Sequence, residues 1–160
     1  GKQSKNNSSL KSRYRLMWMD AVYEPGEVKV VAYNKDGKAV AEKTVRTAGK
    51  PHHIELVSNR NELTADGKDL AYVTVKVVDK DGNLCPTDSR LIHFSVKGAG
   101  KFRAVANGDP TNLEQFHLPK MHAFHGMLTA IVQAGEIAGD LVLTAKASGV
   151  KTGTVHLQAK

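Results

Sequence analysis

The regular alternation of apolar and polar side chains along residues 70–78 constrains the fold of this chain more than any other feature. One face of this segment collects small and β-branched residues: Ala71, Val73, Val75 and Val77. A period of two is typical of a β-strand that buries one face. Similar segments recur at short intervals with glycine between them, and none of the 11-residue windows carries a convincing helical stripe. The pattern predicts an all-β protein with antiparallel sheets.

The alternation also predicts where the other strands lie. We expect them at residues 13–18, 28–33, 39–46, 53–56, 91–96, 102–106, 127–133, 141–147 and 154–158. The inward-facing sets that this predicts include Ile92, Phe94 and Val96, then Leu141, Leu143 and Ala145, then Val155 and Leu157. The Asp-Gly pairs at 36–37 and 81–82 are strong hairpin signals. Asp109 and Pro110 predict one short turn that runs through Gln115.

A break in the pattern divides the chain into two parts. Residues 47–51 (TAGKP) bring glycine and proline together between two strand-like segments, as in a linker. Residues 1–49 offer about three strands, too few to close a sandwich. We therefore expect a partial β-sandwich module, truncated at its N-terminus, with residues 1–12 as a loop or disordered. Residues 50–160 offer about seven strands and predict an immunoglobulin-like antiparallel β-sandwich.

Size and charge exclude several classes of function. The chain has 160 residues, whereas a (β/α)8 barrel needs about 250. The net charge is +7, but residues 1–15 hold five cations and no acid. The basicity is therefore concentrated at one end, so we expect no nucleic-acid partner. No apolar stretch approaches the roughly 18 residues needed to span a bilayer, so we expect no membrane partner. Cys85 is the single cysteine, which excludes an internal disulfide, and we expect it to be a small buried or strand-end residue rather than a nucleophile.

Two clusters of polar residues are candidates for ion sites. Residues 79–83 (DKDGN) resemble the start of a calcium loop, but the glycine and position twelve do not fit, and a hairpin turn explains them. His117, His122 and His125 are the densest histidine cluster, and their spacing favours solvated loop side chains over zinc ligands. His52 and His53 are expected to point to opposite faces of a strand.

No motif of a catalytic site is present. Nucleophile elbows, phosphate loops and zinc-protease motifs are absent from the sequence, and no pair of carboxyl groups stands out. We predict no catalytic, cofactor-binding or metal-binding residue. Trp18, Tyr14 and Tyr23 offer a sugar-stacking platform, although a core position for Trp18 is the favoured interpretation. His156 is expected on a polar strand face.

Three stretches resemble the C-terminal region of bacterial glycoside hydrolase family 2 enzymes of the β-galactosidase type, especially those of Bacteroides-type bacteria. The first combines residues 15–18 (RLMW), 22–26 (VYEPG) and 30–33 (VVAY), and the second is 47–51. The third comprises 65–70 (ADGKDL), 78–82 (VDKDG), Phe94, Gly98, 107–111 (NGDPT), Phe124 and Gly126. Residues 65–69 alone also resemble the immunoglobulin repeats of invasin- and intimin-type adhesins.

The resemblance implies a non-catalytic accessory region. It implies that the parent enzyme hydrolyses terminal β-galactosides with retention through glutamates that lie elsewhere, and that it is periplasmic or extracellular. The implied partners are the catalytic barrel and the sibling domains, and exposed strand edges make a dimer possible. A carbohydrate-binding module and an adhesin-type repeat remain the alternatives.

Overall fold

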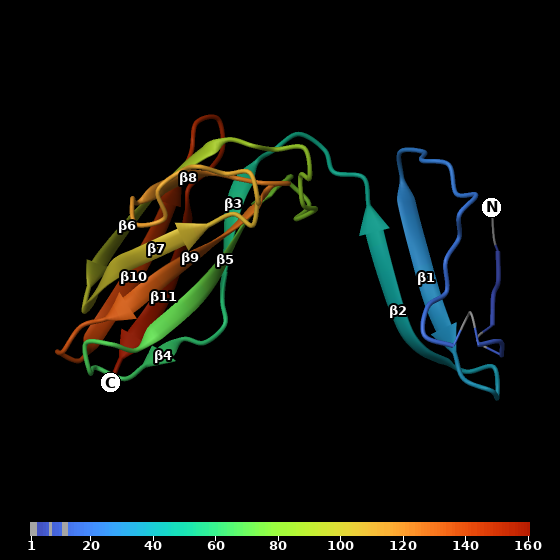
Figure 1. Ribbon diagram of the computed structural model, residues 1–160, viewed down its shortest axis with the longest axis horizontal. Helices are drawn as coiled ribbons and strands as arrows, with labels where there is room; N and C mark the ends of the chain where they lie inside the picture. The colour runs from blue at the N-terminus through green and yellow to red at the C-terminus, as the bar shows by residue number, and fades with distance from the viewer. Residues whose placement is uncertain (1–2, 7, 11–12) are drawn as a thin grey trace. The chain divides into compact units, whose positions relative to one another are not determined.

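The computed structural model describes residues 3–6, 8–10 and 13–160 and is all-β over this range (Figure 1). The chain divides into two compact units, Gly1–Arg46 and Thr47–Lys160. None of the described residues belongs to a helix that is long and apolar enough to span a membrane. Residues 3–6 and 8–10 are free of strand, as expected, and the rest of the predicted N-terminal loop lies outside the described residues.

The described residues of the first unit form one hairpin of two strands, β1 (Glu27–Tyr33) and β2 (Ala39–Arg46). The strands pair antiparallel, and Gly37 adopts a φ of 77° in the turn, which confirms the Asp-Gly hairpin signal. One face carries two ion pairs, Glu27–Arg46 and Lys29–Glu42, with N–O distances of 2.7 and 2.9 Å. The other face is exposed and mostly apolar: it pairs Val28 with Val45 and Ala32 with Ala41, with Lys43 opposite Val30.

The prediction of a strand at residues 13–18 is wrong. The described chain from residue 13 to residue 26 contains no strand, and Tyr14 is 89% exposed. Alternation predicts which face a strand would bury, but a strand also needs a neighbour for its backbone hydrogen bonds. In the described part of this unit, β1 pairs with β2 alone, so that neighbour is missing.

The second unit is a β-sandwich of two sheets (Figure 1). A four-stranded sheet has the order β3-β5-β9-β7, and a five-stranded sheet has the order β4-β11-β10-β6-β8. The strands are β3 (His53–Ser58), β4 (Glu62–Leu63), β5 (Leu70–Val78), β6 (Leu91–Gly98), β7 (Gly100–Ala106), β8 (Lys120–His122), β9 (Met127–Ala134), β10 (Gly139–Lys146) and β11 (Gly153–Ala159). All pairs are antiparallel except β4 with β11. The sandwich is confirmed, and the short strands β4 and β8 were not predicted.

The core lies between the two sheets and consists of the inward faces of their strands. Alternate residues of β5 and β9 are almost fully buried: Ala71, Val73, Val75, Val77, Leu128, Ala130, Val132 and Ala134. Ile92 and Leu143 face them from the other sheet, and Phe94 stacks on Phe102 with a centroid distance of 5.8 Å. Cys85 is 3% exposed, and burial raises the pKa of its thiol, as expected for an inert core residue.

The chain crosses from one sheet to the other at a corner made by Gly98, Ala99 and Gly100. Gly98 ends β6 with a φ of 91°, and Gly100 begins β7 in the opposite sheet. A Cβ on Gly98 would lie 2.0 Å from the carbonyl oxygen of Asp140, and one on Gly100 would lie 2.1 Å from a methyl group of Leu141. The two glycines therefore allow β10 to approach the corner closely.

The edges of the sandwich are short or covered. The five-stranded sheet ends in β4 and β8, which have two and three residues. At the edge of the four-stranded sheet, Ile54 of β3 donates its amide to the carbonyl of Lys151 at 3.1 Å. At the opposite edge, Val105 of β7 donates to the carbonyl of Phe116 at 2.8 Å. Such coverage protects sheet edges from pairing with other chains.

Candidate functional site

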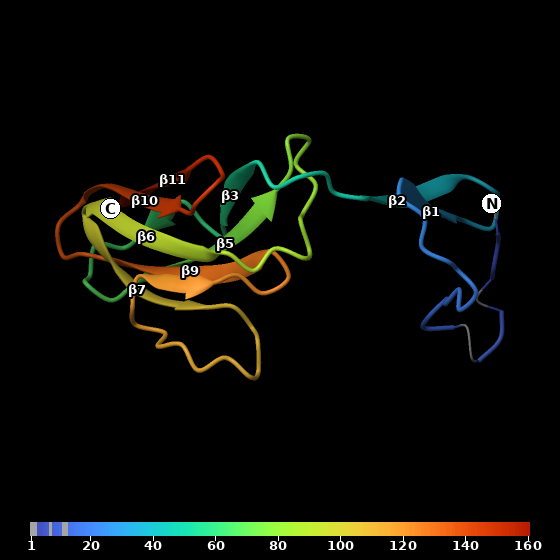
Figure 2. The same cartoon turned by 90° about the horizontal axis from the view of Figure 1, so that it is seen from above.

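An open groove of about 650 Å³ lies on the outer face of the four-stranded sheet. Its floor consists of Leu70 of β5, Ala104 of β7 and Ile131 of β9. Ile131 lies between the buried residues Ala130 and Val132, which places it on the solvent side of β9. Ala104 is its register partner on β7, next to an irregularity in the ladder between Phe102 and Ala104. The wall is the loop of residues 107–119 between β7 and β8, which stands out from the sheet beyond β7 (Figure 2).

Hydrogen bonds hold this loop in place at several points. The Glu114 carboxylate accepts the amide of His122 at 3.1 Å, and its other oxygen lies 3.0 Å from His122 Nδ1. The Asn107 side chain donates to the carbonyl of His122 at 3.0 Å. Together with the bond between Val105 and Phe116, these contacts join the start of the loop and its residues 114 and 116 to β7 and β8. The groove is therefore a preformed feature of the sandwich.

A turn at Asp109 closes the start of the loop. The carboxylate of Asp109 accepts the amide and the hydroxyl of Thr111 at 2.8 and 2.7 Å. The hydrogen bond from the Thr111 amide, followed by the one from the Thr111 hydroxyl, holds the pKa of Asp109 below its usual range. Asn112 donates its amide to the Asp109 carbonyl at 3.2 Å. The predicted turn is present at Pro110 and Thr111, but it does not continue to Gln115.

The three loop histidines are not brought together as a metal site. His122 pairs with Glu114, whereas His125 lies with Nδ1 3.3 Å from the carbonyl oxygen of Pro86 and has a φ of 51°. His117 lines the groove instead. Across the described residues, no group of three or more histidine, cysteine or acidic side chains is placed to hold a metal ion.

The prediction that His52 and His53 point apart is wrong. Their Nδ1 atoms lie 3.0 Å apart, and the two rings meet edge to face with a centroid distance of 5.2 Å. The alternation rule fails because β3 begins at His53, so His52 is not part of the strand. His156 lies exposed on the outer face of β11, as predicted.

The loop of residues 79–83 is a hairpin turn organised around a buried carboxylate. Asp79 is 2% exposed and accepts the amide of Gly49 at 2.7 Å and the amides of Asp81 and Asn83 at 2.9 and 2.8 Å. These donors, with Gly49 contributing most, lower the pKa of Asp79 well below its usual range. Both oxygens of the Asp79 carboxylate accept hydrogen bonds from N–H groups. The carboxylate therefore stabilises the turn and links residue 49 to β5.

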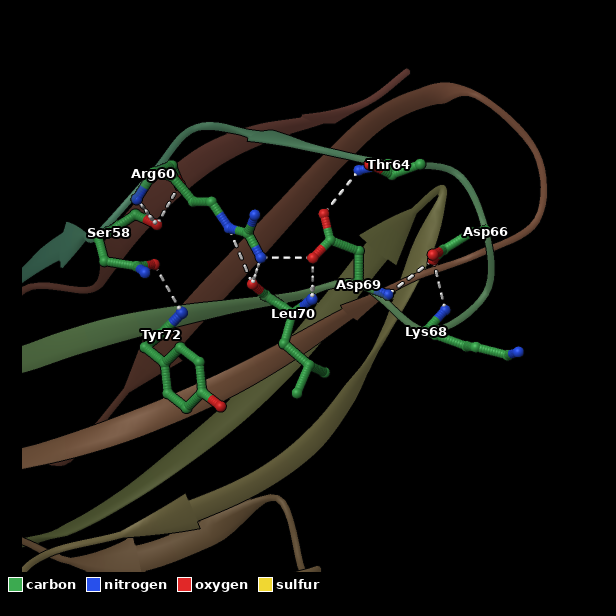
Figure 3. A network of polar contacts seen from close by, with 9 residues as sticks. Ser58, Arg60, Thr64, Asp66, Lys68, Asp69, Leu70 and Tyr72 are labelled. Carbon is green, nitrogen blue, oxygen red and sulfur yellow. Dashed lines mark hydrogen bonds and ion pairs between the residues drawn. The ribbon is translucent and has the colours of Figure 1, made fainter.

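The segment of residues 65–70 forms a second polar corner, between β4 and β5 (Figure 3). Asp69 accepts the amides of Thr64 and Leu70 at 2.8 and 2.9 Å and forms an ion pair with Arg60. The Thr64 amide is the main cause of the lowered pKa of Asp69. Asp66 accepts the amides of Lys68 and Asp69, both at 2.8 Å. Both carboxylates hold the backbone in its turn, so their role is structural.

The aromatic residues singled out in the sequence lie in the first unit. Tyr14 and Tyr23 are 89% and 74% exposed. Trp18 is half-buried outside the hydrophobic core, with Lys5 Nζ 5.6 Å from its ring centroid, so the preference for a core tryptophan is wrong. Contact of these three residues with carbohydrate stays a prediction. The groove residues Arg103 and Phe116 were missed, because no sequence motif connects a residue of β7 with a residue of the loop that follows it.

Comparison with known proteins identifies the family. Residues 54–156 match the model of the glycoside hydrolase family 2 C-terminal domain 5. The chain belongs to this family. Residues 1–41 match a second family model, which is described as a domain of unknown function. The resemblance stated from the sequence is thus confirmed, and the second unit is a family 2 C-terminal domain.

Similar proteins are several times longer than this family 2 chain. A β-galactosidase from Bacteroides ovatus is 44% identical over 138 residues, which are 86% of this chain and 16% of that protein. A solved family 2 glycosyl hydrolase from Bacteroides cellulosilyticus has a TM-score of 0.80 at 31% identity, over 88% of this chain and 18% of its own. A β-glycosidase structure from Bacteroides vulgatus has a TM-score of 0.82 at 27% identity, over 86% and 18%. This chain therefore spans about a sixth of the length of such relatives.

Proposed function

We propose that this chain is a non-catalytic, structural C-terminal region of a β-galactosidase-like glycoside hydrolase. The match of residues 54–156 to the family 2 C-terminal domain carries this proposal. The similarity to a Bacteroides β-galactosidase at 44% identity supports the substrate class. The parent enzyme hydrolyses terminal β-galactosides with retention, and its acid and nucleophile are glutamates elsewhere in the parent protein.

The electrostatics of the described acids support a structural role. Glycoside hydrolysis by two carboxyl groups needs one with a raised pKa to act as the general acid. The turn carboxylates Asp66, Asp69, Asp79 and Asp109 have their pKa lowered, mainly by backbone amides. They are ionised at neutral pH and are tied to their own turns, which suits scaffold residues rather than proton donors.

The rigid sandwich suits a supporting domain. Its core is continuous between the two sheets, and its loops are held by side-chain and backbone hydrogen bonds. Such a domain packs on a catalytic barrel and its sibling domains and keeps them oriented, while its loops vary. These domains are the partners of this chain in the parent enzyme, and the parent works in the periplasm or outside the cell.

Hydrolysis of an aryl β-galactoside by three proteins tests the proposal. The 160-residue chain alone should release no product, whereas the full parent enzyme should turn over the substrate. A parent enzyme that lacks residues 47–160 should keep its acid and nucleophile but inactivate sooner on heating. Turnover by the isolated chain would overturn the non-catalytic role, and a parent enzyme inactive on β-galactosides would overturn the substrate class.

A further inference from the structure

We propose that the groove beside the β7–β8 loop is an accessory site that binds a hexopyranose unit of a galactose-containing glycan. The choice of galactose rests on the proposed function, whereas the sugar-binding chemistry rests on the groove itself. No motif in the sequence marks this site, because its residues come from three strands and one loop. It would hold a glycan on the surface of the domain without any chemical step.

The first argument is an exposed aromatic ring at the groove. Phe116 is 55% exposed although it is a large apolar side chain, and it lines the groove together with Ile131 and Ala104. The axial C–H groups of a pyranose ring form an apolar face that packs on an aromatic ring. Its hydroxyl groups point to the rim, where polar groups must meet them. A groove with an apolar floor and a few polar side chains provides this combination.

The second argument is the set of polar side chains around that ring. Arg103, Gln115 and His117 also line the groove. In the part of the chain that the structure describes, their side chains make no hydrogen bond or ion pair with the protein. A guanidinium, an amide and an imidazole together donate and accept hydrogen bonds, as the vicinal hydroxyls of a sugar require. These groups are therefore available to a ligand.

The third argument is preorganisation. The carbonyl of Phe116 accepts the amide of Val105 at 2.8 Å, so the ring is carried by a loop fixed to the edge strand β7. Glu114 anchors the same stretch through His122 at 3.0 Å. A site that is already formed loses little conformational entropy when a ligand binds. The volume of about 650 Å³ lies within the range of small-molecule sites, and the groove is open enough to admit a chain end or an internal unit.

Titration of the ¹⁵N-labelled 160-residue chain with β-1,4-galactobiose tests the proposal by amide chemical shifts. We expect saturable shifts at residues 103–105, 113–117 and 131, with a dissociation constant on the order of 1 mM for an open site. Phe116→Ala should weaken binding roughly threefold to tenfold through loss of the ring face. Phe116→Tyr should restore it because the face is kept, and Arg103→Ala should weaken it as well.

A matched control distinguishes a specific binding site from nonspecific contact of the sugar with exposed apolar side chains. Ile137 is an exposed apolar residue of the same unit, at 78% exposure, and does not line the groove. Ile137→Ala should leave the titration curve unchanged. The absence of saturable shifts up to about 20 mM sugar, shifts confined to other residues, or normal binding by Phe116→Ala would overturn the proposal. So would concentration-dependent shifts of the groove amides without sugar, because a second copy of the chain would then occupy it.

The test is independent of the proposed enzymatic function. It measures binding by this chain, which is expected to have no turnover, whereas the substrate class is tested by hydrolysis with the parent enzyme. An unoccupied groove would leave the hydrolysis result standing, and an inactive parent enzyme would leave the binding curve standing.

Discussion

Replacing Gly98 with alanine tests the corner at which the chain changes sheets. Gly98 has a φ of 91°, and a Cβ there would lie 2.0 Å from the carbonyl oxygen and 3.0 Å from the carbonyl carbon of Asp140. These are backbone atoms, so they cannot rotate away as the end of a side chain would. β6 and β10 must separate locally to admit the methyl group, although Leu141 pairs with Gly98 in their ladder.

The cost has two parts that a second glycine can separate. A left-handed backbone costs a non-glycine residue about 1–2 kcal/mol, and forcing an extra methyl group into a packed site adds about 1–3 kcal/mol. Gly98→Ala should therefore lose about 2–5 kcal/mol of unfolding free energy. Gly82 has a similar φ of 82°, but a Cβ on this residue would have no atom within 4 Å. Gly82→Ala should lose about 1–2 kcal/mol.

Urea unfolding followed by amide signals of Ala130 and Val132 measures this difference. These residues are buried in β9 of the same unit, whereas the tryptophan fluorescence of Trp18 would report on the other unit. The midpoint of Gly98→Ala should fall below that of Gly82→Ala with little change in slope. Equal losses in the two variants would refute the close approach of β10 to the corner.

Three further predictions concern the core and the buried acid. Ile92→Ala should cost about 2–5 kcal/mol because Ile92 is fully buried, whereas Ile137→Ala should stay within about 0.5 kcal/mol in the same urea assay; similar losses would contradict the core assignment. Cys85 should react with a thiol reagent slowly in native buffer and quickly in denaturant, and fast native reaction would argue against its burial and raised pKa. Hydrogen bonding, led by the Gly49 amide, lowers the pKa of Asp79 in the folded protein. The ionised carboxylate should therefore stabilise the fold fully above the unfolded-state pKa of about 3.9. This stabilisation should be lost as the pH falls through the folded-state pKa. Acid unfolding should thus be less steep for Asp79→Asn, and an unchanged profile would count against this role.

Local pattern predicted the strands of the second unit well. The alternation at residues 70–78 placed Val73 and Val75 in the core, where both are fully buried. The predicted inward positions Ile92 and Leu143 are likewise buried. These predictions work because the side chains of a strand alternate between two faces, so burial on one face follows from the nearby sequence.

The same reasoning failed where a partner strand decides the outcome. Residues 13–18 alternate as a strand would, yet they form none, because hydrogen bonding to a neighbour is needed as well as periodicity. The strands β4 and β8 were missed because two or three residues give no readable period. His52 and His53 meet because His52 lies just outside β3, and a strand boundary is not fixed by local alternation.

The candidate groove shows what only the tertiary structure decided. The sequence by itself determined an all-β chain, its turns, most of its buried faces and its resemblance to family 2 C-terminal regions. The meeting of Arg103, Phe116 and Ile131 depends on the pairing of β7 with β9 and on the bond that ties residue 116 to Val105. Strand register and loop placement join residues far apart in the chain. Their energies depend on contacts that form only when the whole sandwich closes, so the local sequence pattern does not encode the site.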